Sequence, residues 1–381
     1  MVKAMTVFGT RPEGIKMAPV VMELESRGEF EPVVALTAQH RQMLDQVMSL
    51  FSMRADYDLN IMKDRQTLHD ITVRALEGLG RVLADSSPDV VLVQGDTTTA
   101  FAAALAAFYA RIPVGHIEAG LRTDDMYNPF PEEMNRRLIS SLASMHFAPT
   151  AEARRNLLAC GVPADRIFLT GNTVVDALKF MASKSDAPLP EKFVAMHSPD
   201  RRALFVETHR RENLGEPMRR VCRALRRIVE ADEGCEIVFS VHRNPLVREV
   251  VFGELEGLDR VILLDPVDYL VMIRLLRESF FVLTDSGGLQ EEAPSLGKPV
   301  IVLRENTERP EGVRAGNAVL AGTDEDRVFG EAMELLKGGA RYAAMSQASN
   351  PYGDGRAASR IADAILFFKG LSAAPPDEFR G

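Results

Sequence analysis

The sequence of 381 residues has few cysteines, no excess of basic residues and no long apolar run. Its three cysteines, Cys160, Cys222 and Cys235, have no paired spacing, which argues against a disulfide framework or a zinc site. The formal net charge of −9 gives no basic surface of the kind that binds nucleic acid. No segment approaches the roughly 20 apolar residues that span a bilayer. We therefore expect neither a nucleic-acid partner nor a membrane partner.

Targeting and cofactor motifs are also missing. The chain reaches Gly9-Thr10-Arg11-Pro12 after eight residues, which leaves no room for the apolar core of a signal peptide, so a cytoplasmic protein is expected. No Gly-x-Gly-x-x-Gly follows a predicted strand, and no Walker A sequence occurs. No His/Cys pair has metal-ligand spacing. We predict a reaction without cofactor or metal, carried out by acidic and basic side chains.

Short apolar runs alternate with amphipathic stretches, and this alternation predicts an α/β protein with parallel sheets covered by helices on both faces. The chain is long enough for two domains. In the first half, strands are predicted at 4–8, 33–37, 90–94, 114–118, 147–149 and 167–170. Helices are predicted there at 17–26, 68–84, 98–109 and 132–144.

The alternation pauses at residues 183–202, where Pro188, Pro190 and Pro199 occur, and we interpret the pause as a linker. It resumes with strands predicted at 204–207, 237–241, 261–264, 281–284 and 300–303. We predict two Rossmann-like, doubly wound parallel-sheet domains, residues 1–172 and 173–356, with the ligand in a cleft between them. A last helix is predicted near 357–368, and residues 370–381 are expected to form a flexible tail.

Polar residues follow five of the predicted strands at their carboxyl ends, the edge where open α/β sheets bind ligands. These segments are 9–13 with Lys16, 95–99, 118–122, 208–213 and 285–288. Asp96 and Glu118 end two of the strands, and Glu132 opens a helix. Three carboxyls in one pocket would raise at least one pKa and permit proton transfer near neutral pH. Taken singly, Asp96 could be a helix N-cap and Glu132 a partner of the helix dipole.

The segment Asp285-Ser286-Gly287-Gly288 is typical of a phosphate site, because glycines let the backbone approach a ligand and the next helix begins there. A plain N-cap is the alternative. Arg11 and His209 could add cationic donors to a diphosphate. They could equally be a surface ion pair and a structural histidine.

These motifs, in this order, resemble the non-hydrolysing UDP-N-acetylglucosamine 2-epimerases. The matching segments are 9–13 (GTRPE), 94–98 (QGDTT), 116–123 (HIEAGLRT), 131–133 (PEE), 135–136 (NR), 209–213 (HRREN), 285–288 (DSGG) with 290–292 (QEE), 308–311 (ERPE) and 350–355 (NPYGDG). Together they extend from Thr6 to about Ile361. The resemblance implies a fold like that of the two-domain glycosyltransferases (GT-B), a last helix (about 357–369) that packs back on the first domain, and a homodimer.

The resemblance also assigns roles to individual residues. It makes Asp96, Glu118 and Glu132 the acid and base carboxylates, and it places His209 among the catalytic residues, serving the diphosphate and sugar. The substrate-binding residues that it implies are Arg11, Lys16, Arg136, Ser286, Gly287, Gly288, Glu292 and Arg309. A second substrate molecule activates bacterial members of the family, and the residues similar to that allosteric site are Gln42, Gln46, Gln66, Arg210 and His242. Arg243 departs from the family pattern beside this group.

The family's reaction interconverts UDP-GlcNAc and UDP-ManNAc, a precursor of cell-surface polysaccharides. UDP is eliminated to a 2-acetamidoglucal and then added back, which requires a base, an acid and support for the departing diphosphate. Four alternatives share the architecture. They are a hydrolysing 2-epimerase, an epimerase of a related UDP-sugar, a glycosyltransferase and a non-catalytic nucleotide-sugar sensor. A transferase would not need the three carboxylates, and a sensor is expected to have lost one or more of them.

Overall fold

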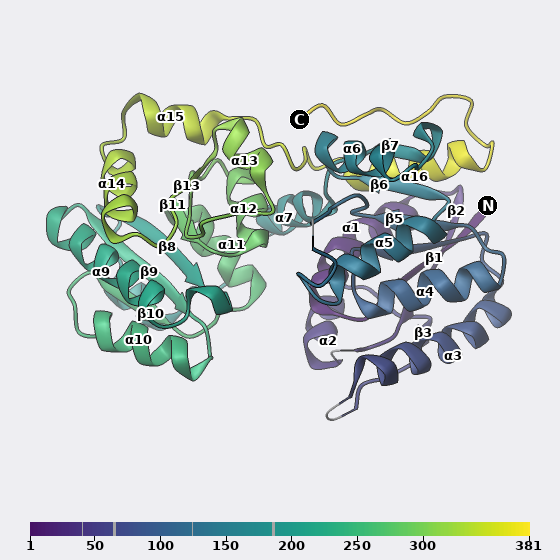
Figure 1. Cartoon of the computed structure of the whole chain (residues 1–381), viewed down its shortest axis with the longest axis horizontal. Helices are drawn as coiled ribbons and strands as arrows, with labels where there is room; N and C mark the ends of the chain where they lie inside the picture. The colour runs from purple at the N-terminus through teal and green to yellow at the C-terminus, as the bar shows by residue number, and fades with distance from the viewer. Residues whose placement is uncertain (40, 64–65, 124, 185–186) are drawn as a thin grey trace. The chain divides into compact units, whose positions relative to one another are not determined.

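The computed structural model describes residues 1–381 except residues 40, 64–65, 124 and 185–186. The side chain of Arg211 is also outside the description. Two compact units make up the chain. The first comprises Met1–Ala177 and Tyr352–Gly381, and the second is Leu178–Pro351. Each unit contains one parallel sheet (Figure 1). The predicted α/β class with two Rossmann-like sheets is therefore confirmed.

The sheet of the first unit has the order β3-β2-β1-β4-β5-β6-β7, with every neighbouring pair parallel. Its strands are β1 (Val2–Phe8), β2 (Phe30–Leu36), β3 (Tyr57–Asp58), β4 (Val90–Gln94), β5 (Val114–Ile117), β6 (Met145–Ala148) and β7 (Ile167–Leu169). The strand order reverses between β1 and β4. Such a switch point leaves a crevice at the carboxyl ends of the strands, where ligands bind in this fold class.

Most helices of the first unit pack on one another in two groups. The helices of this unit include α1 (Arg11–Ser26), α2 (Arg41–Leu50), α3 (Leu68–Ser86), α4 (Thr98–Tyr109), α5 (Glu132–Leu142), α6 (Ala151–Ala159) and α16 (Ala357–Phe368). Helices α3, α4 and α5 form one row, whereas α1 contacts α2 and α16 (Figure 1). The alanines of α4 permit close packing on α3, and most of them are buried. Helix α16 is joined to α1 by an ion pair between Asp363 and Arg27.

The first unit extends beyond the predicted boundaries at 172 and 356. Helix α7 (Thr173–Lys184) crosses the dividing point, and its first turn belongs to the first unit. Val174 and Val175 pack there against buried Tyr352, and the Asp176 carboxylate accepts a hydrogen bond from the Ala358 amide at 2.8 Å. These contacts explain why the first unit keeps residues up to 177 and begins again at 352.

Residues 370–381 are corrected from a flexible tail to a docked segment. The Phe379 amide donates to the Leu169 carbonyl at 2.8 Å, and its ring is only 4% exposed. The guanidinium of Arg360 lies over the same ring at 5.7 Å from its centroid. Burial of one aromatic ring contributes on the order of 2 kcal/mol, which anchors a segment whose composition is otherwise polar and proline-rich.

The sheet of the second unit has the order β10-β9-β8-β11-β12-β13, the Rossmann order. Its strands are β8 (Arg202–Thr208), β9 (Cys235–Val241), β10 (Val261–Leu264), β11 (Ser279–Thr284), β12 (Val300–Val302) and β13 (Ala318–Leu320). Successive residues of β8 enter separate clusters, since Leu204 and Val206 pack in one and Ala203 and Phe205 in the other. This alternation shows that both faces of the sheet are covered.

The helices of the second unit include one within the predicted linker. They are α8 (Glu191–Met196), α9 (Glu216–Ala231), α10 (Pro245–Leu255), α11 (Tyr269–Glu278), α12 (Gly287–Ser295), α13 (Pro310–Ala315), α14 (Glu325–Leu336) and α15 (Gly339–Gln347). Helix α8 contacts β10 and buries Phe193. Residues 183–202 thus include a packed element of the second unit. Within the described part of the chain, no helix combines the length and the apolar character needed to cross a membrane.

Candidate active site

Three neighbouring strands of the first unit end in the polar segments that the sequence singles out. Strands β1, β4 and β5 are adjacent and parallel, so the segments that follow them leave the same edge of the sheet at its switch point. Arg11 begins α1 directly after β1, Asp96 follows β4, and Glu118 follows β5. The sheet topology thus brings three of the predicted site segments together.

A buried carboxylate joins two of these segments. Glu13 Oε2 accepts hydrogen bonds from the amides of Gly9 and Thr10 at 3.0 and 2.8 Å, which forms the capping box of α1. Its Oε1 accepts from the Thr97 hydroxyl, beyond β4. Burial raises the pKa of Glu13, while these hydrogen bonds oppose the increase. The turn that carries Arg11 is therefore held against the turn that carries Asp96.

Glu118 occupies a strained backbone position with a dense set of partners. Its φ of 63° lies in the left-handed region, which costs a glutamate roughly 1–3 kcal/mol. Both carboxylate oxygens lie 2.6 Å from Lys16 Nζ, and the Gln94 amide also donates to Oε2. Asn172 donates to Oε1 at 3.4 Å. Because the side chain is only 5% exposed, these partners hold a desolvated carboxylate in one orientation.

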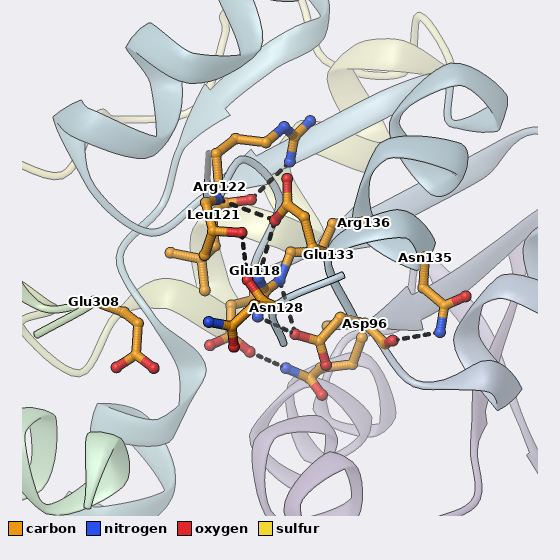
Figure 2. Close-up of polar contacts among 12 residues, drawn as sticks. Asp96, Glu118, Leu121, Arg122, Asn128, Glu133, Asn135, Arg136 and Glu308 are labelled. Atoms are coloured by element: carbon orange, nitrogen blue, oxygen red, sulfur yellow. Dashed lines mark hydrogen bonds and ion pairs between the residues drawn. The ribbon is translucent and has the colours of Figure 1, made fainter. Parts of the chain in front are cut away.

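Asp96 is positioned by α5 (Figure 2). Arg136 approaches Asp96 Oδ2 with Nη2 at 2.6 Å and Nε at 2.8 Å, and Asn135 Nδ2 donates to the Asp96 carbonyl at 2.8 Å. The Asp96 side chain is 26% exposed, so it remains accessible to a ligand. A Cβ added to the adjacent Gly95 would lie 3.7 Å from Glu118 Oε2. Asp96 and Glu118 thus flank the same turn after β4.

The two neighbouring glutamates at the start of α5 have different environments. Glu133 is fully buried, and its carboxylate accepts from Arg137 Nε at 2.8 Å and from the Thr123 amide at 3.1 Å. The Glu132 carboxylate is half-buried and forms no hydrogen bond or ion pair with any residue that the structure describes. Glu132 and Arg136 are four residues apart and share a helix face. Glu133 is therefore a structural residue, and Glu132 is accessible for chemistry.

His116 lies inside the sheet. Its Nε2 is 2.7 Å from the Gly95 carbonyl, and the ring is fully buried. Burial lowers the pKa of His116 to about 4, so the ring is neutral at physiological pH. This histidine supports the turn after β4.

In the second unit, buried Asp285 organises the loop that follows β8. Its carboxylate accepts from the amides of His209 and Arg210 and from Asn213 Nδ2, the last at 2.8 Å. Strands β8 and β11 are neighbours at the switch point of this sheet, so the two loops meet at its carboxyl edge. Burial lowers the pKa of His209, although the Asp285 charge acts in the opposite direction.

The start of α12 forms an open backbone surface. Ser286 is the N-cap, but its side chain makes no capping hydrogen bond. A Cβ at Gly287 would have as its nearest neighbour Arg210 Nη2 at 3.8 Å, and at Gly288 the Ser286 hydroxyl at 3.8 Å. The space around the first residues of the helix is therefore open and lies beside a guanidinium, and both a helix amino end and a guanidinium favour an anion. On the same helix, Glu292 accepts from the buried hydroxyl of Tyr269 at 3.0 Å.

Arg309, a predicted substrate residue, forms an ion pair with buried Glu291. Lys16, a second predicted substrate residue, forms an ion pair with Glu118. Arg11, a third, is exposed and has no hydrogen bond or ion pair with the described residues. Their roles toward a diphosphate stay predictions.

The residues similar to an allosteric site lie in both units. Gln42 and Gln46 are exposed on α2, one turn apart, and Gln66 Nε2 donates to the Gln39 carbonyl at 3.4 Å. In the second unit the His209 and His242 rings stack at 5.9 Å. Arg210 follows His209 and lies 3.6 Å from Glu308. An allosteric role for these residues stays a prediction.

The sequence analysis did not predict two hydrogen-bond partners of Glu118 as site residues. Gln94 and Asn172 both donate to Glu118, and both are buried. Gln94 offered a signal, because it is a polar residue at the end of the apolar run 90–93. Asn172 offered none, since it approaches Glu118 only after β7 has joined the sheet.

Comparison with known proteins supports the same family throughout the chain. The profile of the family described as UDP-N-acetylglucosamine 2-epimerase matches residues 22–366. The UDP-N-acetylglucosamine 2-epimerase of Bacillus subtilis strain 168 is 52% identical over 380 residues, which covers 100% of this chain and 99% of the relative.

Solved structures agree with the fold. A crystal structure from Listeria monocytogenes aligns with a TM-score of 0.94 at 48% identity and covers 100% of both chains. The UDP-GlcNAc 2-epimerase of Neisseria meningitidis, solved with UDP-GlcNAc bound, gives a TM-score of 0.87 at 46% identity, covering 96% of this chain and 100% of the other. With the profile match and full-length identity near one half, the chain belongs to the UDP-N-acetylglucosamine 2-epimerase family of isomerases.

Proposed function

We propose that this protein is a non-hydrolysing epimerase that interconverts UDP-N-acetylglucosamine and UDP-N-acetylmannosamine. The observation that carries the proposal is the pair of carboxylates, Asp96 and Glu118, that flank one turn at the switch point of the first sheet and are each bound by a cation. The substrate of the Neisseria relative, UDP-GlcNAc, supplies the class of ligand.

The chemistry of the substrate defines what the residues must do. The C2 proton of an N-acetylhexosamine is not acidic, because no carbonyl group adjoins C2. We propose that a base removes this proton while the C1–O bond breaks and UDP leaves with the electron pair, which gives 2-acetamidoglucal. UDP then adds back to C1, and an acid delivers a proton to the opposite face of C2. Atoms and charge balance without an oxidant or a metal.

The carboxylates of the first unit would carry the proton transfers. Asp96 is partly exposed, Glu118 is desolvated beside Lys16, and Glu132 has no described partner, so the three differ in environment. Carboxyl groups in different environments can serve as acid and base within one site. Arg136 and Lys16 would also compensate the charge that develops as UDP departs.

The loops of the second unit would hold UDP. The open amides at Gly287 and Gly288, with Arg210 close by, favour a phosphate group, and the Glu292 carboxylate can accept hydrogen bonds from ribose hydroxyls.

Incubation with UDP-N-acetylglucosamine in deuterated water, followed by NMR, tests the proposal. Deuterium should enter C2 as the manno epimer grows, with little free UDP. Stoichiometric release of UDP with free N-acetylmannosamine would instead indicate a hydrolysing enzyme. Absence of both exchange and epimer would contradict the proposed substrate and direct the search to other UDP-sugars or to a sensor role.

The family resemblance extends the proposal to assembly and pathway. We propose a homodimer that supplies UDP-N-acetylmannosamine to the synthesis of a cell-surface polysaccharide. Light scattering coupled to size-exclusion chromatography would give the mass, and a monomer at micromolar concentration would contradict the assembly.

A further inference from the structure

The first unit has a polar pocket that none of the proposed catalytic carboxylates lines. Its volume is about 490 Å³, within the range of small-molecule sites. Arg122, from the loop after β5, lines it together with His146 at the start of β6 and Arg166 just before β7. The exposed thiol of Cys160 is also part of the lining. Arg122 belongs to the same motif as Glu118, residues 116–123, but the proposed reaction gives Arg122 no role.

The charge of this pocket is positive. Among the described residues, its lining contains three arginines and no carboxylate. Arg137 shares its charge with Glu133, but neither Arg122 nor Arg166 has a described carboxylate within 4.0 Å. Within the described ranges, Arg122 donates to the Leu121 carbonyl and the Ser140 hydroxyl, both at 2.8 Å. Two guanidinium charges therefore lack an anionic partner among the described residues.

Helix dipoles do not account for these charges. Helices α5 and α6 both end near the pocket, and each carboxyl end is equivalent to about half a negative charge. Their sum offsets roughly one of the two guanidinium charges. Neither Arg122 nor Arg166 donates to a carbonyl of these helices. An attractive field for an anion remains.

Two buried nitrogen atoms at the pocket have no partner in the described structure. They are Nε of Arg122 and Nδ1 of His146, whose side chain is 1% exposed. A buried polar atom without a partner costs about 1–3 kcal/mol. Burial lowers the pKa of His146 to about 3, so the ring is neutral and carries a single N–H. The ring hydrogen bond to the Ala143 backbone uses this N–H at Nε2, which leaves Nδ1 as an acceptor.

We propose that this pocket is a binding site for a phosphate group, carried by free phosphate or by a small phosphate monoester. Planar guanidinium groups bind phosphate oxygens in pairs, so Arg122 and Arg166 would provide the main contacts. The Nδ1 atom of the neutral His146 ring would accept a hydrogen bond from a protonated phosphate oxygen. The volume leaves room for a small organic group on the phosphate. This site is independent of the proposed epimerase reaction.

Because Cys160 lines the pocket, the reactivity of its thiol reports on occupancy of the pocket in the full-length protein. Cys222 and Cys235 are fully buried, so alkylation of the native protein by neutral iodoacetamide reports on Cys160. Alkylation would be followed by mass spectrometry while inorganic phosphate or uridine monophosphate replaces chloride at constant ionic strength. A bound anion should slow the reaction in a saturable way, reaching about tenfold at roughly ten times Kd. Stronger protection by the nucleotide would assign the site to monoesters, and equal protection to phosphate itself.

Three variants separate this site from others. Arg166→Gln, at an exposed position, should weaken protection about tenfold or more, the scale of one charged hydrogen-bonding contact. Arg155→Gln is the matched control, because Arg155 is exposed on α6, pairs with Glu152 and does not line the pocket. Arg11→Ala should leave protection intact.

Three results would overturn the proposal. They are no protection up to roughly 50 mM phosphate at constant ionic strength, unchanged protection in Arg166→Gln, and protection that is lost in Arg11→Ala but retained in Arg166→Gln. The last result would place the phosphate at the proposed substrate site instead.

Discussion

Two carboxylates at the edge of the first sheet differ in the way they are held. The Asp96 side chain is 26% exposed and bound by Arg136 alone among the described cations, whereas the Glu118 side chain is 5% exposed and surrounded by Lys16, Gln94 and Asn172. An accessible carboxylate can reach a substrate proton without breaking a network. Asp96 is therefore the residue whose chemistry can be tested with the least structural disturbance.

Asp96→Asn should lower turnover by about 10²–10⁴-fold, the usual contribution of a group that transfers a proton. Affinity for UDP should change little, because the amide keeps an acceptor toward Arg136. Turnover would be measured by NMR and UDP affinity by calorimetry. Glu152→Gln, at a carboxylate that pairs with Arg155 on α6, serves as a control expected to match the wild type. Near-normal turnover of Asp96→Asn would remove Asp96 from the mechanism.

At the scale of elements, helix starts carry much of the proposed site. Helix α1 presents Arg11, α5 presents Glu132, and α12 presents the open amides at Gly287 and Gly288. Helix amino ends favour anions and place unpaired N–H groups at a surface. The glycines of α12 matter because a side chain there would occupy the space that we assign to phosphate.

Gly287→Ala should separate stability from binding. The backbone conformation does not require glycine and the added Cβ meets no atom closer than 3.8 Å, so the fold should keep its stability. Affinity for UDP should nevertheless fall, because the methyl group occupies the phosphate position.

Gly330→Ala in α14 is the matched control, since a Cβ there also meets no atom within 4 Å. It lies inside the helix and should gain about 0.5–1 kcal/mol in stability, with unchanged UDP affinity. Urea unfolding and calorimetry on both variants provide the measurements. Equal UDP affinity in Gly287→Ala and wild type would argue against phosphate at the start of α12.

Helix α2 carries the predicted regulatory residues on its exposed face. If Gln46 contributes to activation by a second substrate molecule, Gln46→Ala should make the curve of rate against substrate concentration less sigmoidal. Ser49→Ala, at an exposed position on the same helix, is the control. Curves of Gln46→Ala and wild type that superimpose would exclude this role.

For the molecule as a whole, buried titratable groups make stability depend on pH in opposing directions. Burial lowers the pKa of His116 to about 4 and that of His146 to about 3. These histidines contribute stability above their unfolded pKa of 6.5, which is lost as pH falls through the folded values. Burial raises the pKa of Asp176 to about 6, so its contribution is present below the unfolded value of 3.8 and is lost as pH rises through about 6.

Asp176→Asn should remove the loss of stability that accompanies ionisation of Asp176 as pH rises. The amide keeps the acceptor for the Ala358 amide, but the side chain no longer ionises. The free energy of unfolding of the variant, minus that of the wild type, should therefore increase between about pH 4 and pH 6, by at most about 3 kcal/mol. Urea unfolding at several pH values gives this difference. A difference that does not depend on pH would show that Asp176 ionises normally in the folded chain.

Much of the architecture could be predicted from local sequence. The apolar runs at 90–94 and 261–264 coincide with β4 and β10, and the segment 98–109 coincides with α4. Strands β3 and β13 were not predicted, because they have only two and three residues and are partly exposed. Helix α8 was not predicted either, because six residues are too few to show a clear hydrophobic periodicity. The docking of Phe379 could not be predicted either, since its surroundings come from β7 and α16.

The sequence alone determined the α/β class, the sites where polar segments follow strands and the family, because all of these depend on the order and type of neighbouring residues. Tertiary structure decided which side chains meet. Lys16 pairs with Glu118 across 102 positions, and Arg136 pairs with Asp96 across 40. Such contacts depend on strand order and on the reversal between β1 and β4, which no local period encodes. The separation of buried Glu133 from accessible Glu132 is likewise a consequence of how α5 packs.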